Sequence, residues 1–183
     1  MIIHINGQPG VGKYTVAKHL AKKLNARLID NHSILNTAMV CADHGTPEYI
    51  RIAMELVEYV YAELVKRPED EVMIFTNCLV EQFENDKKRY GAVKDLAVKR
   101  EVAHIPIQLA CDLEENMQRI QSEERAAKKK LMDPEVLKSS RAHHTFIHPE
   151  SDPLALRLDN TNLTAEQTAE KIYQHVMDVK ASK

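Results

Sequence analysis

The sequence has little of several features that would mark other classes of protein. It contains no tryptophan, and its three cysteines stand far apart, without the C-x-x-C spacing of a zinc site or the dense pairing of a disulfide framework. No apolar run reaches the roughly 18 residues that a membrane span needs. The first residues reach a glycine and a lysine too soon for a signal peptide. These absences favour a reducing, cytoplasmic setting.

The charge balance also excludes some partners. The chain has 25 Lys and Arg against 27 Asp and Glu, a formal net charge of -2, so no global field favours nucleic acid or a membrane surface. With 183 residues, 44% apolar and 28% charged, the composition is that of an ordinary globular protein. We expect one domain spanning residues 1–183, and the composition leaves the oligomeric state open.

Hydrophobic periodicity predicts alternating strands and helices. A β-branched run at 2–6 precedes a helical pattern at 13–24, and a capping-box sequence opens the last helix at Thr164. The stretch 125–153 is charged and is the least core-like part of the chain. The alternation predicts an α/β fold of three layers, α/β/α, around a parallel sheet. The other predicted strands are 26–29, 72–75, 104–110 and 154–158, and the other predicted helices are 33–43, 47–66, one from about 92, and one from 112 toward 124.

The segment between the first strand and the first helix matches G-x-x-x-x-G-K. Its glycines let the backbone approach a ligand closely, and its N–H groups converge at the positive end of the helix dipole. We therefore predict a phosphate-binding loop (P-loop), in which Lys13 reaches the β- and γ-phosphates of ATP. The predicted nucleotide-binding residues are Gly7, Pro9, Gly10, Val11, Gly12, Lys13, Tyr14 and Thr15, with Gln8 between them.

Tyr14 departs from the usual form of this loop. The residue after the lysine normally offers a hydroxyl to Mg²⁺, and a tyrosine hydroxyl sits too far from its backbone to replace it easily. Adenylate kinases have a similar loop, G-x-P-G-x-G-K-G-T, with threonine one position later. Either Thr15 takes the role here, or waters hold the metal. The strand ending Ile74-Phe75-Thr76-Asn77 also lacks the carboxylate of a Walker B motif.

With this loop, Asp30 after the second strand and a late pair of arginines, the chain resembles the nucleoside-monophosphate kinase and shikimate kinase group. The resemblance covers nearly the whole chain, and the loop is its most specific part. It implies a five-stranded parallel sheet in the order 2-3-1-4-5, acceptor-binding helices at about 33–66 and a helical lid at about 119–150 that closes over ATP. It also implies ATP and Mg²⁺ as cofactors.

The resemblance assigns roles to several residues. Asp30 takes the place of a carboxylate near the acceptor hydroxyl and the metal, so Asp30 is the candidate base and, with Thr15, the candidate metal ligand; the alternative is an aspartate that caps the following helix. Arg119 would lie against the adenine and Arg125 would reach the transferring phosphate. The alternative for both is a solvated helix arginine paired with nearby glutamates.

Two further groups of residues lie late in the chain. Asn160 and Thr161 follow the last strand, where the resemblance puts backbone near the adenine edge. The histidines of the late stretch do not favour zinc, because no cysteine or carboxylate stands at ligand spacing. These histidines are His143, His144 and His148.

The sequence therefore predicts an ATP-dependent phosphotransferase with catalytic residues Lys13, Asp30 and Arg125 and a small-molecule or nucleotide acceptor. A GTPase is disfavoured, because no N-K-x-D motif follows a strand. An ATP-binding protein without a kinase acceptor, either an ATPase or a nucleotide-dependent regulator, remains open.

Overall fold

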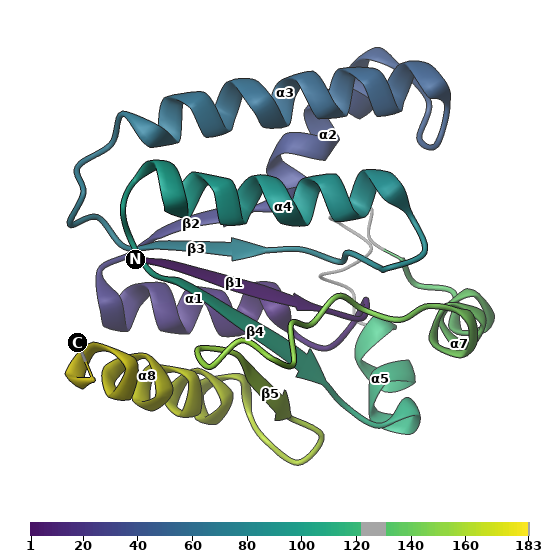
Figure 1. Ribbon diagram of the computed structural model, residues 1–183. Coiled ribbons are helices and arrows are strands. Elements are labelled where there is room, and N and C mark those ends of the chain that lie inside the picture. The colour runs from purple at the N-terminus through teal and green to yellow at the C-terminus, as the bar shows by residue number, and fades with distance from the viewer. Residues whose placement is uncertain (122–130, 183) are drawn as a thin grey trace.

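The computed structural model describes residues 1–121 and 131–182. A five-stranded sheet lies between two layers of helices (Figure 1). Its order is β2-β3-β1-β4-β5 and every neighbouring pair is parallel, which confirms the predicted fold class. The strands are β1 (Ile2–Gly7), β2 (Arg27–Asp30), β3 (Met73–Thr76), β4 (His104–Ala110) and β5 (Leu156–Asp159).

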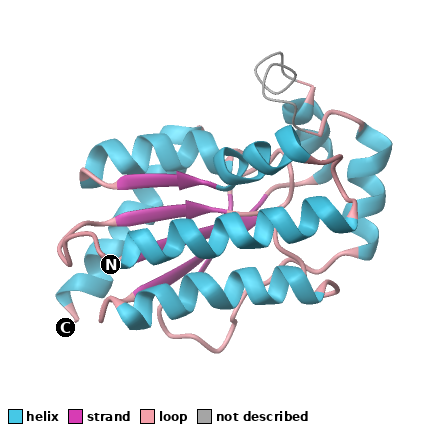
Figure 2. Cartoon of the chain, turned by 90° about the horizontal axis from the view of Figure 1, so that it is seen from above, coloured by secondary structure: helices cyan, strands magenta, loops and turns pink. Residues whose placement is uncertain are grey.

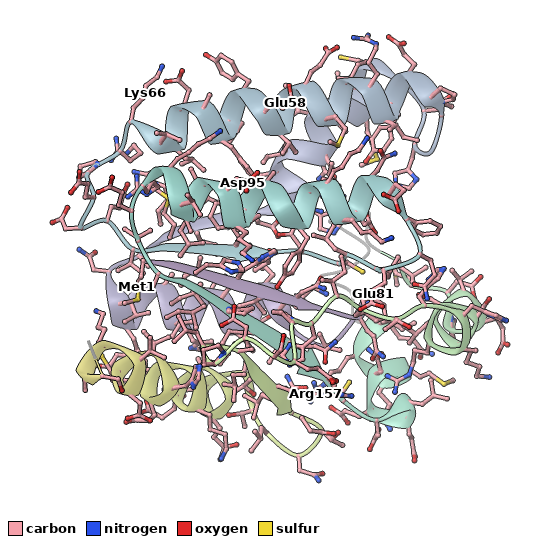
Figure 3. The ribbon with its side chains drawn as sticks, viewed as in Figure 1. Met1, Glu58, Lys66, Glu81, Asp95 and Arg157 are labelled. Carbon is pink, nitrogen blue, oxygen red and sulfur yellow. The ribbon has the colours of Figure 1, made fainter. Side chains whose placement is uncertain are left out.

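Helices cover both faces of the sheet (Figure 2). Two lie on one face, α1 (Lys13–Leu24) and α8 (Ala165–Ala181), and two on the other, α3 (Pro47–Val65) and α4 (Glu84–Lys99). Three shorter helices lie at or near the carboxyl ends of the strands (Figure 1): α2 (Asn31–Cys41), α5 (Leu113–Ile120) and α7 (Pro134–His143). Met1 and Glu81 mark the two opposite ends of the sheet in Figure 3.

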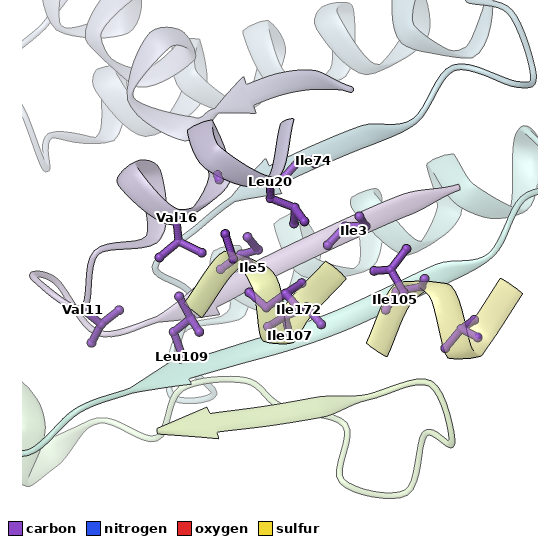
Figure 4. Close-up of a cluster of buried hydrophobic side chains, with 14 of the residues drawn as sticks. Ile3, Ile5, Val11, Val16, Leu20, Ile74, Ile105, Ile107, Leu109 and Ile172 are labelled. Carbon is purple, nitrogen blue, oxygen red and sulfur yellow. The ribbon is translucent and has the colours of Figure 1, made fainter. Parts of the chain in front are cut away.

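The core follows from the alternation of side chains along the strands. Residues of β1 and β4, among them Ile5 and Ile107, meet Leu20 of α1 and Ile172 of α8 on one face (Figure 4). On the other face Phe75 packs in a second cluster with residues of α3 and α4. Each fully buried aliphatic side chain contributes about 1.5–3 kcal/mol. Helices therefore pack on both faces of the sheet. A site can form at the edge where the carboxyl ends of the strands meet.

Two helices differ from the prediction. α4 begins at Glu84, eight residues before the expected Ala92, and the acidic residues Glu84 and Asp86 in its first turn favour its positive end. Hydrophobic periodicity does not predict α7, because only Leu137 of that helix is buried, but α7 falls within the range of the helical lid that the resemblance implies. Asp133 caps α7 by accepting hydrogen bonds from the backbone N–H groups of the first turn. Residues 122–130, which belong to the predicted lid, lie outside the described residues.

Within the described part of the chain, no helix combines the length and the apolar character needed to cross a membrane. The capping box predicted at the last helix is present: the Thr164 hydroxyl accepts from the Gln167 N–H, and the Gln167 side chain accepts from the Thr164 N–H.

Candidate active site

A cleft of about 1400 Å³ opens at the carboxyl edge of the sheet. It runs from the loop after β1 to α2 and α3 on one side and to α5 and the segment after β5 on the other. Neither Gly7, which is buried at the end of β1, nor Thr161 lines it. The predicted residues that do line it are Pro9, Gly10, Val11, Gly12, Lys13, Tyr14, Thr15, Asp30, Arg119 and Asn160.

The start of α1 has the form of an anion site. Gly12 is its N-cap and has a φ of 88°. Because the residue is a glycine, it has no side chain that could cap the helix. The first turn carries no acidic residue. The first N–H groups of a helix lack intrahelical partners, and together with the helix dipole they favour a bound anion. This end of α1 therefore faces the cleft without a carboxylate that would compete with phosphate.

The side chain of Lys13 folds back toward the beginning of this loop. Its Nζ donates to the carbonyl oxygens of Gly7 and Gln8, both at 2.7 Å. These bonds hold the ammonium group beside the backbone N–H groups of the loop. A phosphate chain seated there would meet a charge that is already in place.

Neighbouring elements hold the loop from outside. Asn116 Nδ2 donates to Pro9 O at 2.8 Å, and Asn160 Nδ2 donates to Val11 O at 2.9 Å. Gly7 passes so close to the Leu109 carbonyl that a Cβ would overlap it. The loop is thus fixed to α5, to β4 and to the end of β5.

Arg141 of α7 contacts the phosphate loop directly. Its NH1 donates to Gln8 Oε1 at 2.6 Å, to Cys111 O at 3.0 Å and to Asn116 Oδ1 at 3.1 Å. Arg141 therefore ties α7 to the phosphate loop.

The residues predicted on the adenine side come together. Arg119 donates to Asn160 Oδ1 at 3.0 Å, to Asn160 O at 2.9 Å and to Thr161 O at 3.2 Å. Its Nε also pairs with Glu115 at 2.7 Å, and its side chain is 22% exposed. The pairing with Glu115 is the alternative that the sequence left open, but the guanidinium is anchored in the cleft wall as well.

Thr161 points its hydroxyl away from the cleft. The hydroxyl donates to Asp159 Oδ1 at 2.6 Å and accepts from the Asp112 N–H at 2.9 Å. Its backbone carbonyl, however, receives Arg119. Arg125, the predicted partner of the transferring phosphate, lies outside the described residues.

Asp30 ends β2 and faces the cleft. It stands at the N-cap of α2, but its side chain makes no capping hydrogen bond there. Its Oδ1 instead accepts the hydroxyl of Thr76, its register partner on β3, at 2.8 Å. The alternative of a helix-capping aspartate therefore does not describe this carboxylate.

Three residues beside Asp30 were not predicted. Asn31 Oδ1 accepts from Asn77 Nδ2 at 3.2 Å and also from Arg89. Arg89, whose side chain is 14% exposed, pairs with Asp86 at 3.5 Å. We call the part of the cleft formed by Asp30, Asn31, Asn77 and Arg89 the acceptor half, after the role that the resemblance predicts for Asp30.

An apolar wall borders the acceptor half. It comes from α2 and α3, and the exposed ring of Phe83 lies at the cleft as well. Arg51 of α3 does not reach the cleft, because Glu48 and Glu55 hold it on the outer surface. The wall residues are Leu35, Met39, Tyr49, Ala53 and Met54.

The donor set fits a magnesium ion that is held mainly by phosphate. Mg²⁺ usually takes one or two carboxylates, substrate phosphates and waters. Thr15 and Asp30 both line the cleft and offer a hydroxyl and a carboxylate. In the described residues no cluster of three histidine, cysteine, aspartate or glutamate side chains could hold a metal. A nucleotide would therefore have to bring most of the ligands.

Two histidines, one fully buried and one partly buried, lie behind the acceptor half. His4 of β1 is fully buried, and its ring lies 4.7 Å from that of Tyr90. Burial, and then the nearby His104, lower the pKa of His4 from 6.5 to about 3. Burial also lowers the pKa of His104 to about 4. Both imidazoles are therefore neutral near pH 7.

Comparisons with known proteins agree with this geometry. A family model described as an AAA domain matches residues 3–143, so the chain belongs to that family. No curated protein matches the sequence.

Solved structures extend the comparison to the whole chain. Shikimate kinase from Acinetobacter baumannii superposes with a TM-score of 0.62 at 20% identity, covering 98% of this chain and 94% of that one. A gluconokinase from Sinorhizobium meliloti gives 0.61 at 12% identity, covering 97% and 91%. The tunicamycin resistance protein of Deinococcus radiodurans gives 0.61 at 15% identity, covering 96% and 94%. The fold is that of the P-loop kinases of the shikimate kinase-like group, which confirms the resemblance.

The two inner glycines of the loop give a first prediction. Gly10 and Gly12 both have φ 88°, so alanine at either position costs about 1–2 kcal/mol of backbone strain. A Cβ at Gly10 would also overlap Asn116 Nδ2 and Ile120, whereas one at Gly12 meets no atom. Gly10→Ala should therefore lower the free energy of unfolding clearly more than Gly12→Ala in urea titrations. Equal losses would contradict the close packing of the loop on α5.

The lowered pKa values of His4 and His104 give a second prediction. Their pKa values are lower in the folded chain than in the unfolded chain, so the unfolded chain binds more protons as the pH falls below about 6.5. The contribution of the two neutral histidines to the free energy of unfolding should therefore be fully present above that pH and be lost as the pH drops. Between about pH 6.5 and about pH 5, His4 alone should account for roughly 2 kcal/mol.

Urea unfolding of the wild type and of His4→Gln across this range measures the effect. The carboxylates titrate in both proteins and cancel in the comparison. The variant should show the shallower dependence on pH, and parallel curves would show that His4 is not held neutral by burial.

Proposed function

We propose that this protein is an ATP-dependent phosphotransferase that moves the γ-phosphoryl group to a hydroxyl or phosphate group of a small molecule. The main support is the arrangement of the cleft: an uncapped helix start with Lys13 lies at one side, and the carboxylate Asp30 faces the same space from the end of β2. Phosphoryl transfer needs mainly positioning and charge stabilisation, and this arrangement supplies both.

In this proposal the loop of residues 7–15 binds the phosphate chain, and Lys13 stabilises the charge that develops on the transferring group. Asp30 orients the attacking hydroxyl and takes its proton. The acceptor oxygen forms a bond to the γ-phosphorus as the bond to the β–γ bridging oxygen breaks, and ADP leaves. Bound Mg²⁺, with Thr15 and Asp30 as its protein ligands, would neutralise phosphate charge.

The adenine side of the proposed site is formed by Arg119 and Asn160, and the backbone carbonyl of Thr161 helps to hold the Arg119 guanidinium there. Arg125 is proposed as a further contact of the transferring phosphate. The apolar wall of α2 and α3 favours an acceptor that has an apolar part beside its hydroxyl groups. The protein would then bind two ligands, ATP and this acceptor, at opposite halves of one cleft.

Tyr14 favours a second candidate, an ATP-binding protein without a kinase acceptor. The tyrosine stands where a P-loop usually places a metal-binding hydroxyl, and its ring lines the cleft and lies 5.8 Å from Lys18 Nζ. Such a protein would bind ATP and would release inorganic phosphate slowly or not at all.

The deciding experiment incubates the protein with Mg²⁺ and γ-labelled ATP and a panel of nucleosides, nucleoside monophosphates, shikimate, gluconate and other hydroxylated metabolites. Label should move to one class of acceptor. Lys13→Ala should lower kcat/KM by about 10²–10³ because transition-state charge is no longer stabilised. Asp30→Asn should lower it by about 10²–10⁴.

Lys22→Ala is the matched control, because Lys22 lies exposed in the last turn of the same helix. Its activity should equal that of the wild type. Tight ATP binding without label transfer to any acceptor would favour the second candidate, and full activity of Lys13→Ala would overturn the proposed mechanism.

A further inference from the structure

A chain of hydrogen bonds runs from the buried side of the sheet to the acceptor half. His104 Nε2 lies 3.3 Å from His4 Nδ1, and His4 Nε2 lies 3.0 Å from Asn77 Oδ1. Asn77 then contacts Asn31, and Asn31 contacts Arg89. His4 is fully buried and does not line the cleft, but these bonds link it to Asn77, Asn31 and Arg89, which do.

The direction of every bond in the chain follows from Arg89. A guanidinium can only donate, so the atom of Asn31 that meets it must be the acceptor Oδ1. Asn77 reaches the same oxygen, so Asn77 must present its Nδ2 there. Its Oδ1 consequently faces His4 and requires a donor.

His4 must therefore carry its proton on Nε2. The ring is fully buried, and in the described part of the chain it pairs with no carboxylate, so it is neutral and its Nδ1 is a bare acceptor. His104 Nε2, which faces that Nδ1, must then carry the proton of His104. The structure thus defines the tautomer of both rings.

We propose that His4 is a positioning residue: its Nε2–H sets the orientation of the Asn77 amide, and the amide in turn holds Asn31 and Arg89 in place for the acceptor. The claim that these side chains serve an acceptor rests on the proposed function. The orientation of the amide does not.

The Asn77 side chain needs the hydrogen bond that His4 Nε2–H donates to its Oδ1. Asn77 is 4% exposed, so its Oδ1 would be left without a donor inside the protein if His4 lost its Nε2–H. Rotation of the Asn77 side-chain amide by half a turn would then become more favourable. Rotation would bring its oxygen against Asn31 Oδ1, where two acceptors repel each other, and Arg89 would lose its fixed partner.

His4→Leu removes the donor and keeps an apolar side chain in the core. We expect KM for the acceptor to rise about tenfold, a change typical of one lost buried hydrogen bond, while KM for ATP stays the same. His4→Gln, whose amide nitrogen can take the place of Nε2, should restore KM for the acceptor to within about threefold of the wild type.

Ile2→Ala is the control for general damage to the core, because Ile2 lies on the same strand and on the same face of the sheet, outside the chain of hydrogen bonds. It should lower stability without a selective rise in KM for the acceptor. Equal effects of His4→Leu and Ile2→Ala on KM, or no rescue by His4→Gln, would overturn the positioning role.

A second measurement does not depend on the reaction. Long-range ¹⁵N–¹H NMR spectra of the wild type should show both His4 and His104 as the Nε2–H tautomer, and the Asn77 side-chain amide signals should shift in His4→Leu. A His4 ring protonated on Nδ1 would refute the inference even if the enzyme is a kinase. If the tautomers are as stated but no acceptor is phosphorylated, the proposed function fails and the orientation of Asn77 stands.

Discussion

The start of α1 has no side chain to cap it, and the rest of the site depends on this constraint. Gly12 is needed at the N-cap for its left-handed backbone, and it leaves the helix dipole and the first N–H groups to an external anion. The loop before it is held by Asn116, by Asn160 and by the close approach of Gly7 to β4. The backbone N–H groups at this end of α1 are therefore in place for an anion, and Lys13 is fixed beside them. A phosphate that bound there would require little further ordering of the loop.

The same strand that leads into the loop also anchors the opposite wall of the cleft. Asn6, next to the loop, accepts from the Leu79 N–H at 2.8 Å and donates to the carbonyls of Leu79 and Ile147, both at 2.9 Å. Val80 pairs with Phe146 in an antiparallel bridge. The segment after β3, which leads to Phe83 and the acceptor half, is thus joined to the segment after α7. Arg141 of α7 also contacts Gln8. The phosphate loop and the acceptor half are therefore connected through the same set of hydrogen bonds. His4 lies in β1, the strand that leads into the loop.

The sequence was sufficient to predict the fold class, the five strands and the phosphate loop, because these rest on local signals: β-branched runs, helical periodicity and glycine spacing. It also predicted Asp30, Arg119 and Asn160, which the structure brings to one cleft. Their roles remain predictions. Arg89 and Asn77 were missed for a physical reason. Arg89 lies in the first turns of α4, where charged residues hide the helical pattern, and Asn77 matters only through partners that are 46 and 73 residues away in the chain. Single-sequence patterns do not reveal such long-range hydrogen bonds.

The most direct test of the phosphate cradle is calorimetric titration with Mg²⁺-ATP, ADP, AMP and adenosine. The loop is expected to bind through the β-phosphate and its neighbours, so ATP and ADP should bind with one molecule per chain, and AMP and adenosine at least about tenfold more weakly. AMP binding as tightly as ATP, or no binding of any of the four, would contradict the account.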